Sequence, residues 1–425
     1  MSNRLMKDSG VEWIGEIPAN WKVCRFKNVV QLFTGNSIKD TEKDKYEDSI
    51  DARPYISTKD IDKAFSTIDY DNGLYVKYND YSFRLAPKGS SLMCIEGGSA
   101  GIKKAILNQD VSFVNKLCCF YGTKIDNRYL YYFLLCPCYE DEFQKNIVGL
   151  IGGVSVEKLK NFSLLLPSQY EQICIADFLD RKCAEIDGLL NDIQAQIDDL
   201  EQYKKSVITE AVTKGLNPEV PMKDSGIEWV GMIPRHWKVI PNKHIMKKKK
   251  DICSKYNGED ILSLTMNGVI VRDLDTGGKK PSSFDGYQIV YPNNLLMCLF
   301  DYDVTPRCIG LVKNYGLTSP AYCQFVMLNG NSEKYYYYYF LMIDHTKALL
   351  HLAKNLRHSF TEEQLGSIIA PVPPAEEQIA IAEFLDKVIA KADSVIMLKQ
   401  EQLEELEKYK KSLIYEYVTG KKELK

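Results

Sequence analysis

The strongest constraint on the fold is a segment of some forty residues that occurs twice at a fixed offset. Residues 171–180 and 203–208 return as residues 377–386 and 409–414, 206 positions later. A self-match at a fixed spacing marks an internal repeat whose copies fold alike. We therefore expect the two halves of the chain to share one architecture.

Each copy predicts a long helix with a coiled-coil seam, because its apolar residues recur in alternating steps of three and four. Proline precedes each copy and glycine follows it, as is typical of helix boundaries. A lone stripe of this length needs a partner, and the nearest one is the other copy; two independent surface helices are the alternative. The predicted helix–helix core is Ile186, Leu190, Ile193, Ile197, Leu200 and Val207 in the first copy, and Ile389, Ile396, Leu403, Leu406 and Leu413 in the second.

Three lysines, Lys204, Lys399 and Lys410, stand at seam positions where an apolar residue is expected. Such a lysine can contact a partner, set the register of the two helices, or extend its amino group out to water along the apolar surface. We favour the third interpretation.

A second repeat opens each half. Residues 7–23 return as residues 223–239, and all four tryptophans of the chain lie in these two segments. Paired tryptophans at this spacing predict an extended leading segment that is fixed to a domain by burying its indole rings. A role in stacking on a ligand is the alternative.

A globular block lies between each leading segment and the following long helix. Short apolar runs at 90–95, 111–121, 295–300 and 322–328 predict strands, whereas 129–135 and 335–343 predict helices. The tyrosine run 335–339 could stack on bases, but five consecutive residues point all round a helix, so packing is favoured. The predicted plan is an α+β protein with segments 1–165, 166–215, 216–370 and 371–425.

Composition is that of an ordinary globular protein, with 45% hydrophobic and 26% charged residues. The chain of 425 residues exceeds one usual hydrophobic core, and no apolar run reaches the length of a membrane span. The first ten residues lack the apolar core of a signal peptide, so we expect a cytoplasmic protein. The twelve cysteines show no CxxC spacing and predict neither disulfides nor a zinc site.

Charge is unevenly distributed although the net charge is only −3. Blocks 22–165 and 238–370 carry +2 and +4, whereas the helical segments 166–215 and 371–425 carry −5 and −2. This distribution suits globular blocks that meet a polyanion and helices that meet protein.

Motifs for chemistry are absent. No stretch fits a phosphate-binding GxxxxGK[ST] loop, a GxGxxG turn or an HExxH metal motif. The only Asn-Pro pair, Asn217-Pro218, is followed by glutamate and not by the Pro-aromatic sequence of amino-methyltransferases. The chain therefore has no predicted catalytic residue and no predicted metal ligand.

The binding candidates are polar and basic loops of the globular blocks. Lysines would contact phosphates, and polar or arginine side chains at base edges would discriminate sequence by about 1–3 kcal/mol per good pair. A solvated surface charge is the alternative for each lysine. The candidates are Asn36, Lys39, Ser99, Lys103 and Lys104 in the first block, and Lys247, Lys248, Lys249, Lys250, Thr305 and Arg307 in the second.

With both repeats described, the chain resembles the specificity subunit of type I restriction-modification systems over nearly its whole length. The resemblance rests on the twin leading segments, on the Glu-Gln-Ile starts at 171 and 377, and on the Tyr-Lys-Lys-Ser starts at 203 and 409. Together these motifs are specific for the family, whereas any one alone would be weak.

The resemblance implies two β-rich target recognition domains separated by two long antiparallel coiled-coil helices, with pseudo-twofold symmetry. Each domain would read one half of a split site in double-stranded DNA. The helices would fix the spacing and dock the modification (methyltransferase) subunits. A restriction (translocase-nuclease) subunit would complete the complex, with S-adenosylmethionine, ATP and magnesium on the partner subunits and no cofactor in this chain.

Two further readings remain. The chain could be a structural scaffold whose globular blocks bind protein and not DNA, or a methylation-only or silent specificity subunit that lacks a restriction partner. The sequence does not predict the recognised bases, the gap length or the methylated base.

Overall fold

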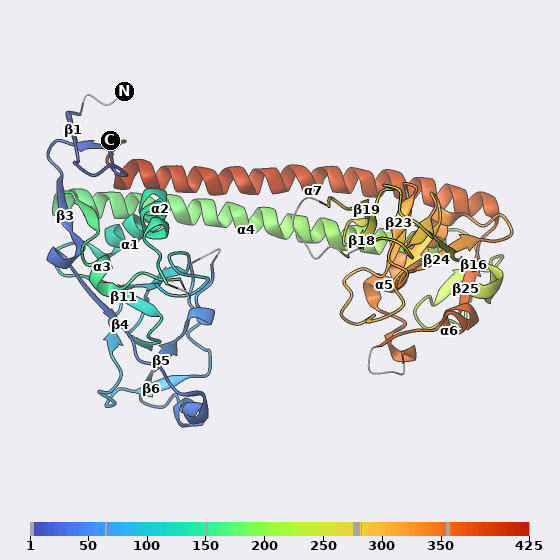
Figure 1. The fold of residues 1–425 in the computed structure, drawn as a ribbon, viewed down its shortest axis with the longest axis horizontal. Coiled ribbons are helices and arrows are strands. Elements are labelled where there is room, and N and C mark those ends of the chain that lie inside the picture. The colour runs from blue at the N-terminus through green and yellow to red at the C-terminus, as the bar shows by residue number, and fades with distance from the viewer. Residues whose placement is uncertain are drawn as a thin grey trace. The chain divides into compact units, whose positions relative to one another are not determined.

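The computed structural model describes residues 4–63, 66–149, 152–274, 281, 283–353 and 358–424. The chain divides into two compact units (Figure 1), Met1–Gln194 with Gln400–Lys425, and Ala195–Lys399. Each long helix contributes one end to each unit. The division therefore differs from the four consecutive segments expected from the sequence.

Unit 1 contains two four-stranded sheets, with strand orders β4-β11-β8-β9 and β6-β5-β10-β7. Its main core lies between the first sheet, α1, α2 and the two long helices. Its elements are β1 Met6–Asp8, β2 Glu16–Pro18, β3 Lys22–Arg25, β4 Val30–Thr34, β5 Ala52–Ile56, β6 Tyr75–Lys77, β7 Leu85–Ala86, β8 Ser91–Cys94, β9 Lys104–Ile106, β10 Val111–Phe113, β11 Leu117–Gly122, α1 Asn127–Leu135, α2 Pro137–Lys145, α3 Val156–Leu159, β12 Ser163–Leu166 and the start of α4 Gln169–Lys214.

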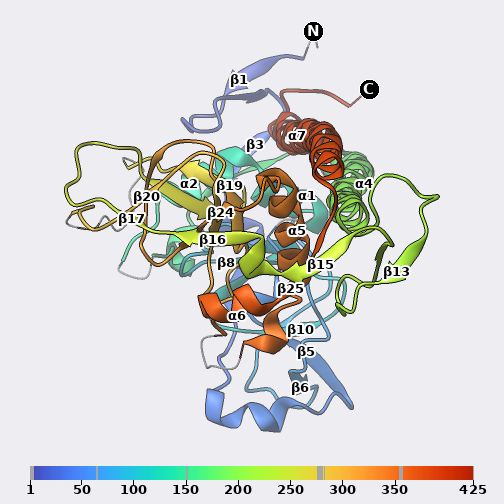
Figure 2. The same cartoon turned by 90° about the vertical axis from the view of Figure 1, so that its right-hand side faces the viewer.

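Unit 2 repeats the first sheet of unit 1 with the order β16-β24-β21-β22, which Figure 2 shows beside α5. Its elements are β13 Met222–Asp224, β14 Met232–Pro234, β15 Lys238–Pro241, β16 Met246–Lys249, β17 Asp251–Ile252, β18 Leu262–Thr265, β19 Gly268–Val271, β20 Gln288–Val290, β21 Leu295–Met297, β22 Ile309–Leu311, β23 Gly316–Thr318, β24 Cys323–Met327, α5 Glu333–Thr346, α6 Glu362–Ser367, β25 Ile369–Val372 and the start of α7 Ala375–Val418.

The predicted strands and helices are found, with one correction. The run 111–121 is two strands, β10 and β11, and not one. A turn separates them, in which the Leu117 N–H donates to the Val114 carbonyl at 3.1 Å. The turn exposes Asn115 and Lys116.

The two long helices run antiparallel inside each unit. In unit 1 the rings of Phe178 and Tyr417 lie 4.4 Å apart, and Asp187 pairs with Lys410. A later residue of α4 thus meets an earlier residue of α7, so the two helices run in opposite directions. In unit 2, Lys204 pairs with Asp393 in the same sense. Each residue of the predicted seam is buried or half-buried, as a seam between two helices requires.

Two of the three seam lysines, Lys204 and Lys410, form reciprocal ion pairs between the helices, and Lys399 donates to the Gln196 side chain. Lys410 Nζ lies 2.6 Å from Asp187 in unit 1, and Lys204 Nζ lies 2.6 Å from Asp393 in unit 2. Burial alone would lower the pKa of Lys204, but its hydrogen bonds to Asp393 and Glu201 raise the pKa. The interpretation of Lys204 and Lys410 as extending past the seam to water is therefore wrong. Specific polar pairs inside a seam set its register.

The tyrosine-rich helix α5 is part of the core. Tyr335, Tyr336, Tyr338 and Tyr339 are buried, so they are not a stacking surface for bases. The Tyr335 hydroxyl donates at 2.9 Å to the carbonyl of Val212, at the end of α4. In unit 1 the Tyr129 hydroxyl donates likewise to Val418 at the end of α7, at 3.2 Å. Each hydroxyl satisfies a carbonyl that the helix end leaves without an intrahelical partner.

One tryptophan of each leading segment is a buried anchor, and the other, Trp13 or Trp229, is half-buried. Trp21 and Trp237 are buried, and their indole nitrogens donate to Glu171 at 3.2 Å and to Glu377 at 2.9 Å. This geometry supports the predicted structural role. The glutamates belong to the repeated Glu-Gln-Ile motif, so the motif joins each leading segment to a long helix.

The environment of Glu171 should make the stability of the fold depend on pH. Burial alone would raise the pKa of Glu171, but hydrogen bonds from Ser168, Trp21 and Arg4 outweigh it and lower the pKa to about 2. A carboxylate with a lowered pKa stabilises the folded state above its ordinary pKa near 4.5, and this stability is lost as the pH falls toward 2.

We expect Glu171→Gln to lower the melting temperature of the chain at pH 6. The difference from wild type should shrink as the pH is lowered from 5 to 3. Glu157→Gln, at an exposed pair with Lys160, is the matched control and should leave the melting temperature unchanged at each pH. A Glu171→Gln deficit that stays constant down to pH 3 would contradict the assigned role.

Candidate functional site

A polar surface forms in unit 1 where β4 ends and two other loops meet it. The backbone N–H of Asn36 donates to the Phe113 carbonyl at 2.9 Å. The Ser37 hydroxyl donates to Asn115 Oδ1 at 2.7 Å. The loop after β4 therefore lies against the turn between β10 and β11.

The loop between β6 and β7 completes this surface. The Arg84 N–H donates to Asn36 Oδ1 at 3.0 Å, and its guanidinium donates to the Thr34 carbonyl at 3.1 Å. These bonds fix exposed Arg84 against the loop after β4, which also carries the exposed Lys39. We name as the strand-end surface Thr34, Asn36, Ser37, Lys39, Arg84, Asn115 and Lys116.

A cavity of about 540 Å³ adjoins the strand-end surface, with Thr34, Asn115 and Glu96 among its lining residues. The glycine-rich loop after β8 reaches it, because Gly97 N–H donates to the Gly152 carbonyl at 2.7 Å. A side chain at Gly153 would meet the Ile95 carbonyl at 2.9 Å, so the absence of a side chain lets the two loops approach closely. The site thus combines cations, amides and one carboxylate on closely packed loops.

Of the candidates predicted in the first block, Asn36 and Lys39 lie on the strand-end surface. Ser99 is half-buried, and its carbonyl accepts from Ile102 and Lys103 inside its own loop. Lys103 donates its amino group to the Thr58 carbonyl at 2.8 Å. These two residues shape the glycine-rich loop.

The prediction for Lys104 is wrong. Its side chain is buried in the core, and its amino group donates to the Leu134 carbonyl and pairs with Glu140, both at 2.6 Å. Burial lowers the pKa of Lys104, and Glu140 opposes this shift. Lys104 therefore joins β9 to α1 and α2 and has no free amino group for a phosphate.

In unit 2 the basic run occupies β16 and its end. Lys247 and Lys250 are exposed, and Lys250 is the counterpart of Thr34 by the offset of 216 between the leading segments. Lys248 pairs with Glu362 at 3.0 Å, and this hydrogen bond raises the pKa of Lys248. The run thus offers two exposed cations at the corresponding sheet edge.

Lys249 stands over an aromatic ring at the same edge. Its amino group lies 3.5 Å from the ring centre of Tyr291 and 3.4 Å from Asp251. A hydrogen bond to Asp251 raises the pKa of Tyr291. The ring of Tyr315, which is exposed, packs edge-on against Tyr291 at 5.8 Å. This edge of unit 2 therefore presents cations and aromatic rings together.

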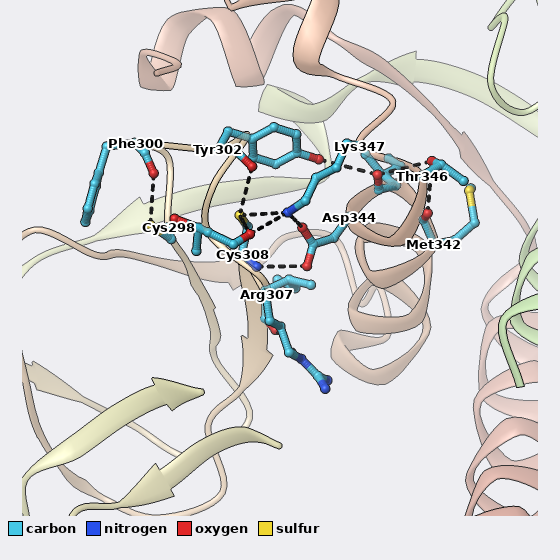
Figure 3. Close-up of polar contacts among 12 residues, drawn as sticks. Cys298, Phe300, Tyr302, Arg307, Cys308, Met342, Asp344, Thr346 and Lys347 are labelled. Carbon is cyan, nitrogen blue, oxygen red and sulfur yellow. Dashed lines mark hydrogen bonds and ion pairs between the residues drawn. The ribbon is translucent and has the colours of Figure 1, made fainter. Parts of the chain in front are cut away.

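Thr305 and Arg307 lie in a loop that is fastened to α5 (Figure 3). Buried Asp344 accepts from the Cys308 N–H at 2.8 Å and from Lys347 at 2.7 Å. Lys347 also donates to the Thr305 carbonyl at 2.7 Å. The loop is held in one conformation by a buried ion pair.

The guanidinium of Arg307 is bonded inside unit 2. It donates to the carbonyls of Met266 at 2.7 Å and Ile309 at 3.1 Å, and to the Tyr337 hydroxyl. The structure therefore gives Arg307 a role in joining the β18–β19 turn to β22 and α5. Thr305 is half-buried beside it.

Sequence reasoning missed Arg84, Asn115 and Lys116. Each lies in a short turn with no motif around it, and the three loops that meet are far apart in the sequence. A cation or amide in a turn between two predicted strands is the only signal that could have indicated them.

Among the residues that the structure describes, no group of three or more histidine, cysteine, aspartate or glutamate side chains is placed to hold a metal ion. Within the same ranges, no helix is both long and apolar enough to cross a bilayer.

Comparison with known proteins gives a family match in both halves of the chain. Residues 18–199 and 302–408 match the profile described as type I restriction modification DNA specificity domain. The two matched regions together cover more than half of the chain.

Among curated proteins, the chain is similar to the type I restriction enzyme MjaVIII specificity subunit of Methanocaldococcus jannaschii. The two are 25% identical over 436 residues, which covers 95% of this chain and 93% of that protein. The putative type I restriction enzyme MjaX specificity subunit of the same organism is 26% identical over 438 residues. This match covers 96% of this chain and 95% of that protein.

Among solved structures, the chain resembles one from work on complex assembly and conformational transition of the type I restriction-modification system. The TM-score is 0.70 at 12% identity, and the match covers 95% of this chain and 98% of that one. At this identity the likeness shows the fold.

Proposed function

The chain belongs to the type I restriction-modification DNA specificity family, and from this premise we propose that each of its two units recognises one half of a bipartite DNA site. Its role is DNA recognition within such a system. The family match in both halves is the observation that supports the proposal most, since a repeated recognition domain implies two readers.

The loops suit this division of labour. In unit 1, Lys39 and Lys116 supply cations for phosphates, and Arg84, Asn115 and Glu96 supply the groups that discriminate base edges. In unit 2, Lys247 and Lys250 supply the cations. The two surfaces differ in sequence although their sheets correspond, so the half-sites should differ.

The finer parts of the assignment are proposals as well. The long helices would set the separation of the two half-sites and dock the modification subunits, and a restriction subunit would join the complex. The chain would perform no chemistry, so S-adenosylmethionine, ATP and magnesium would be held by those partners. We expect it to act in the cytoplasm.

Salt dependence of duplex binding tests the function. We expect the chain assembled with its modification subunits to bind duplex DNA, and the affinity to fall by about a thousandfold or more between 50 and 200 mM salt if six or more phosphates are contacted. Fluorescence anisotropy with a labelled duplex at several salt concentrations measures this. A scaffold that binds only protein would show no binding at the lowest salt.

A further inference from the structure

A buried arginine organises one exposed loop of unit 1. Arg53 lies on β5 with 3% of its surface exposed, and its Nε donates to the Ser112 hydroxyl on β10 at 2.8 Å. Its other two nitrogens donate at 3.3–3.4 Å to backbone carbonyls of the loop between β6 and β7. These carbonyls belong to Lys77, Tyr78, Asp80 and Phe83.

The loop crosses a sheet from edge to edge. β6 and β7 are the two edge strands of the β6-β5-β10-β7 sheet, and both run antiparallel to β5 and β10, so residues 78–84 return along the sheet as they cross β5 and β10. Phe83 turns inward and packs edge-on against Tyr55 at 6.0 Å. We name residues 78–84 the Arg53 loop. The Arg53 guanidinium bonds the backbone of this loop, and the Phe83 ring fixes the part of the loop that precedes β7.

All five acceptors of the Arg53 guanidinium are uncharged oxygens. A buried cation with uncharged acceptors is costly, because burial removes its hydration without a bonded opposite charge. Burial accordingly lowers the pKa of Arg53, and Asp80 opposes this shift. Such a cost is expected where an exposed loop must be held in one conformation for binding.

The loop carries exposed aromatic and cationic side chains. Tyr81 is 93% exposed, the highest value among the large hydrophobic side chains that the structure describes as exposed. Tyr78 is half exposed. Arg84 follows at the end of the loop and is bonded to the strand-end surface through Thr34 and Asn36. An aromatic ring beside a cation is the pairing that nucleic acids recognise through stacking, sugar contacts and guanine or phosphate contacts.

We propose that the Arg53 loop is a specificity-determining element for one DNA half-site, with Tyr81 and Arg84 as its DNA contacts and Arg53 as the positioning residue. The proposal rests on the proposed function and adds named contacts to it. β5 and β6 lie on the side of unit 1 away from α4 (Figure 1), and Figure 2 agrees. The loop therefore extends the strand-end surface away from the helices.

The test uses the chain in complex with its modification subunits. Binding is measured for a cognate duplex and for duplexes with one base pair changed in either half-site. For each variant, the ratio of cognate to changed-duplex affinity gives discrimination at each half-site. An unfolded fraction of the sample lowers both affinities equally, so a loss of stability alone leaves this ratio unaltered.

Tyr81→Ala and Arg84→Ala are each expected to reduce discrimination about tenfold at one half-site and to leave the other unchanged. Arg53→Lys keeps the positive charge but not the fork of donors, and should reduce discrimination at the same half-site. Lys22→Ala removes an exposed cation from β3, next to α4, and serves as the matched control with both ratios retained.

The outcomes separate this proposal from the function on which it rests. If the wild-type complex shows no salt-dependent duplex binding, the proposed function fails. If wild type discriminates at both half-sites and all three loop variants keep both ratios, the function stands and the loop assignment is overturned. An equal loss at both half-sites overturns it too, because the loop would then not read one half-site.

Discussion

Exchanging residues 22–165 for the corresponding block of a family relative is expected to change one half of the methylated DNA sequence and to leave the other half unaltered. The strand-end surface and the Arg53 loop lie wholly inside this block. The second set of cations, Lys247 and Lys250, lies outside it. The recognition loops can therefore be exchanged as one unit, provided the assembly surfaces are kept.

The exchange keeps the contacts to the long helices only if the incoming block supplies a backbone N–H for Gln172 and a tyrosine hydroxyl for the end of α7. Gln172 Oε1 accepts from the Asp126 N–H at 2.7 Å, and Tyr129 donates to the end of α7. A donor block with a helix cap and a tyrosine at these positions is the appropriate choice. Methylation mapping of host DNA measures the result, and the reciprocal exchange of residues 238–370 is the control. A change in both halves after the first exchange would contradict the assignment of one reader to each unit.

Lys104→Ala is expected to lower the free energy of unfolding of unit 1 by about 1–3 kcal/mol, because it leaves the buried Leu134 carbonyl and the half-buried Glu140 without their donor. Its side chain also packs over the ring of Tyr139. Denaturant unfolding followed by intrinsic fluorescence measures the change.

Lys160→Ala is the control, since its pair with Glu157 is exposed and is worth about 0–1 kcal/mol. At a temperature where both variants are folded, the salt slope of DNA binding should equal that of wild type. If Lys104→Ala lowered the salt slope of DNA binding and left the stability unchanged, Lys104 would be a DNA contact after all.

The anchors are repeated with their environments. Glu171 and Glu377 accept from the indoles of Trp21 and Trp237. Gln172 and Gln378 accept from the backbone N–H of the residues that cap α1 and α5, Asp126 and Ser332. Because these residues belong to the repeated motifs, the sequence indicated them, although it could not show what each one bonds.

The candidate site was predicted less completely than the fold. Asn36 and Lys39 were indicated because they follow an apolar strand directly. Arg53, Arg84 and Asn115 were not, since their roles depend on three loops that meet only when the two sheets of unit 1 form. A cationic residue has the same appearance in the sequence whether it is buried, as Lys104 is, or exposed, as Lys39 is.

The sequence by itself determined the internal repeat, the two long helices with their seam, and the family, because each is a pattern of spacing along the chain. Only the tertiary structure decided which lysines are available, that Lys204 and Lys410 pair across the helices, and that Arg53 holds the backbone of the loop after β6. The physical reason is that periodicity is a local property, whereas the environment of a long charged side chain is set by segments distant in sequence that fold around it.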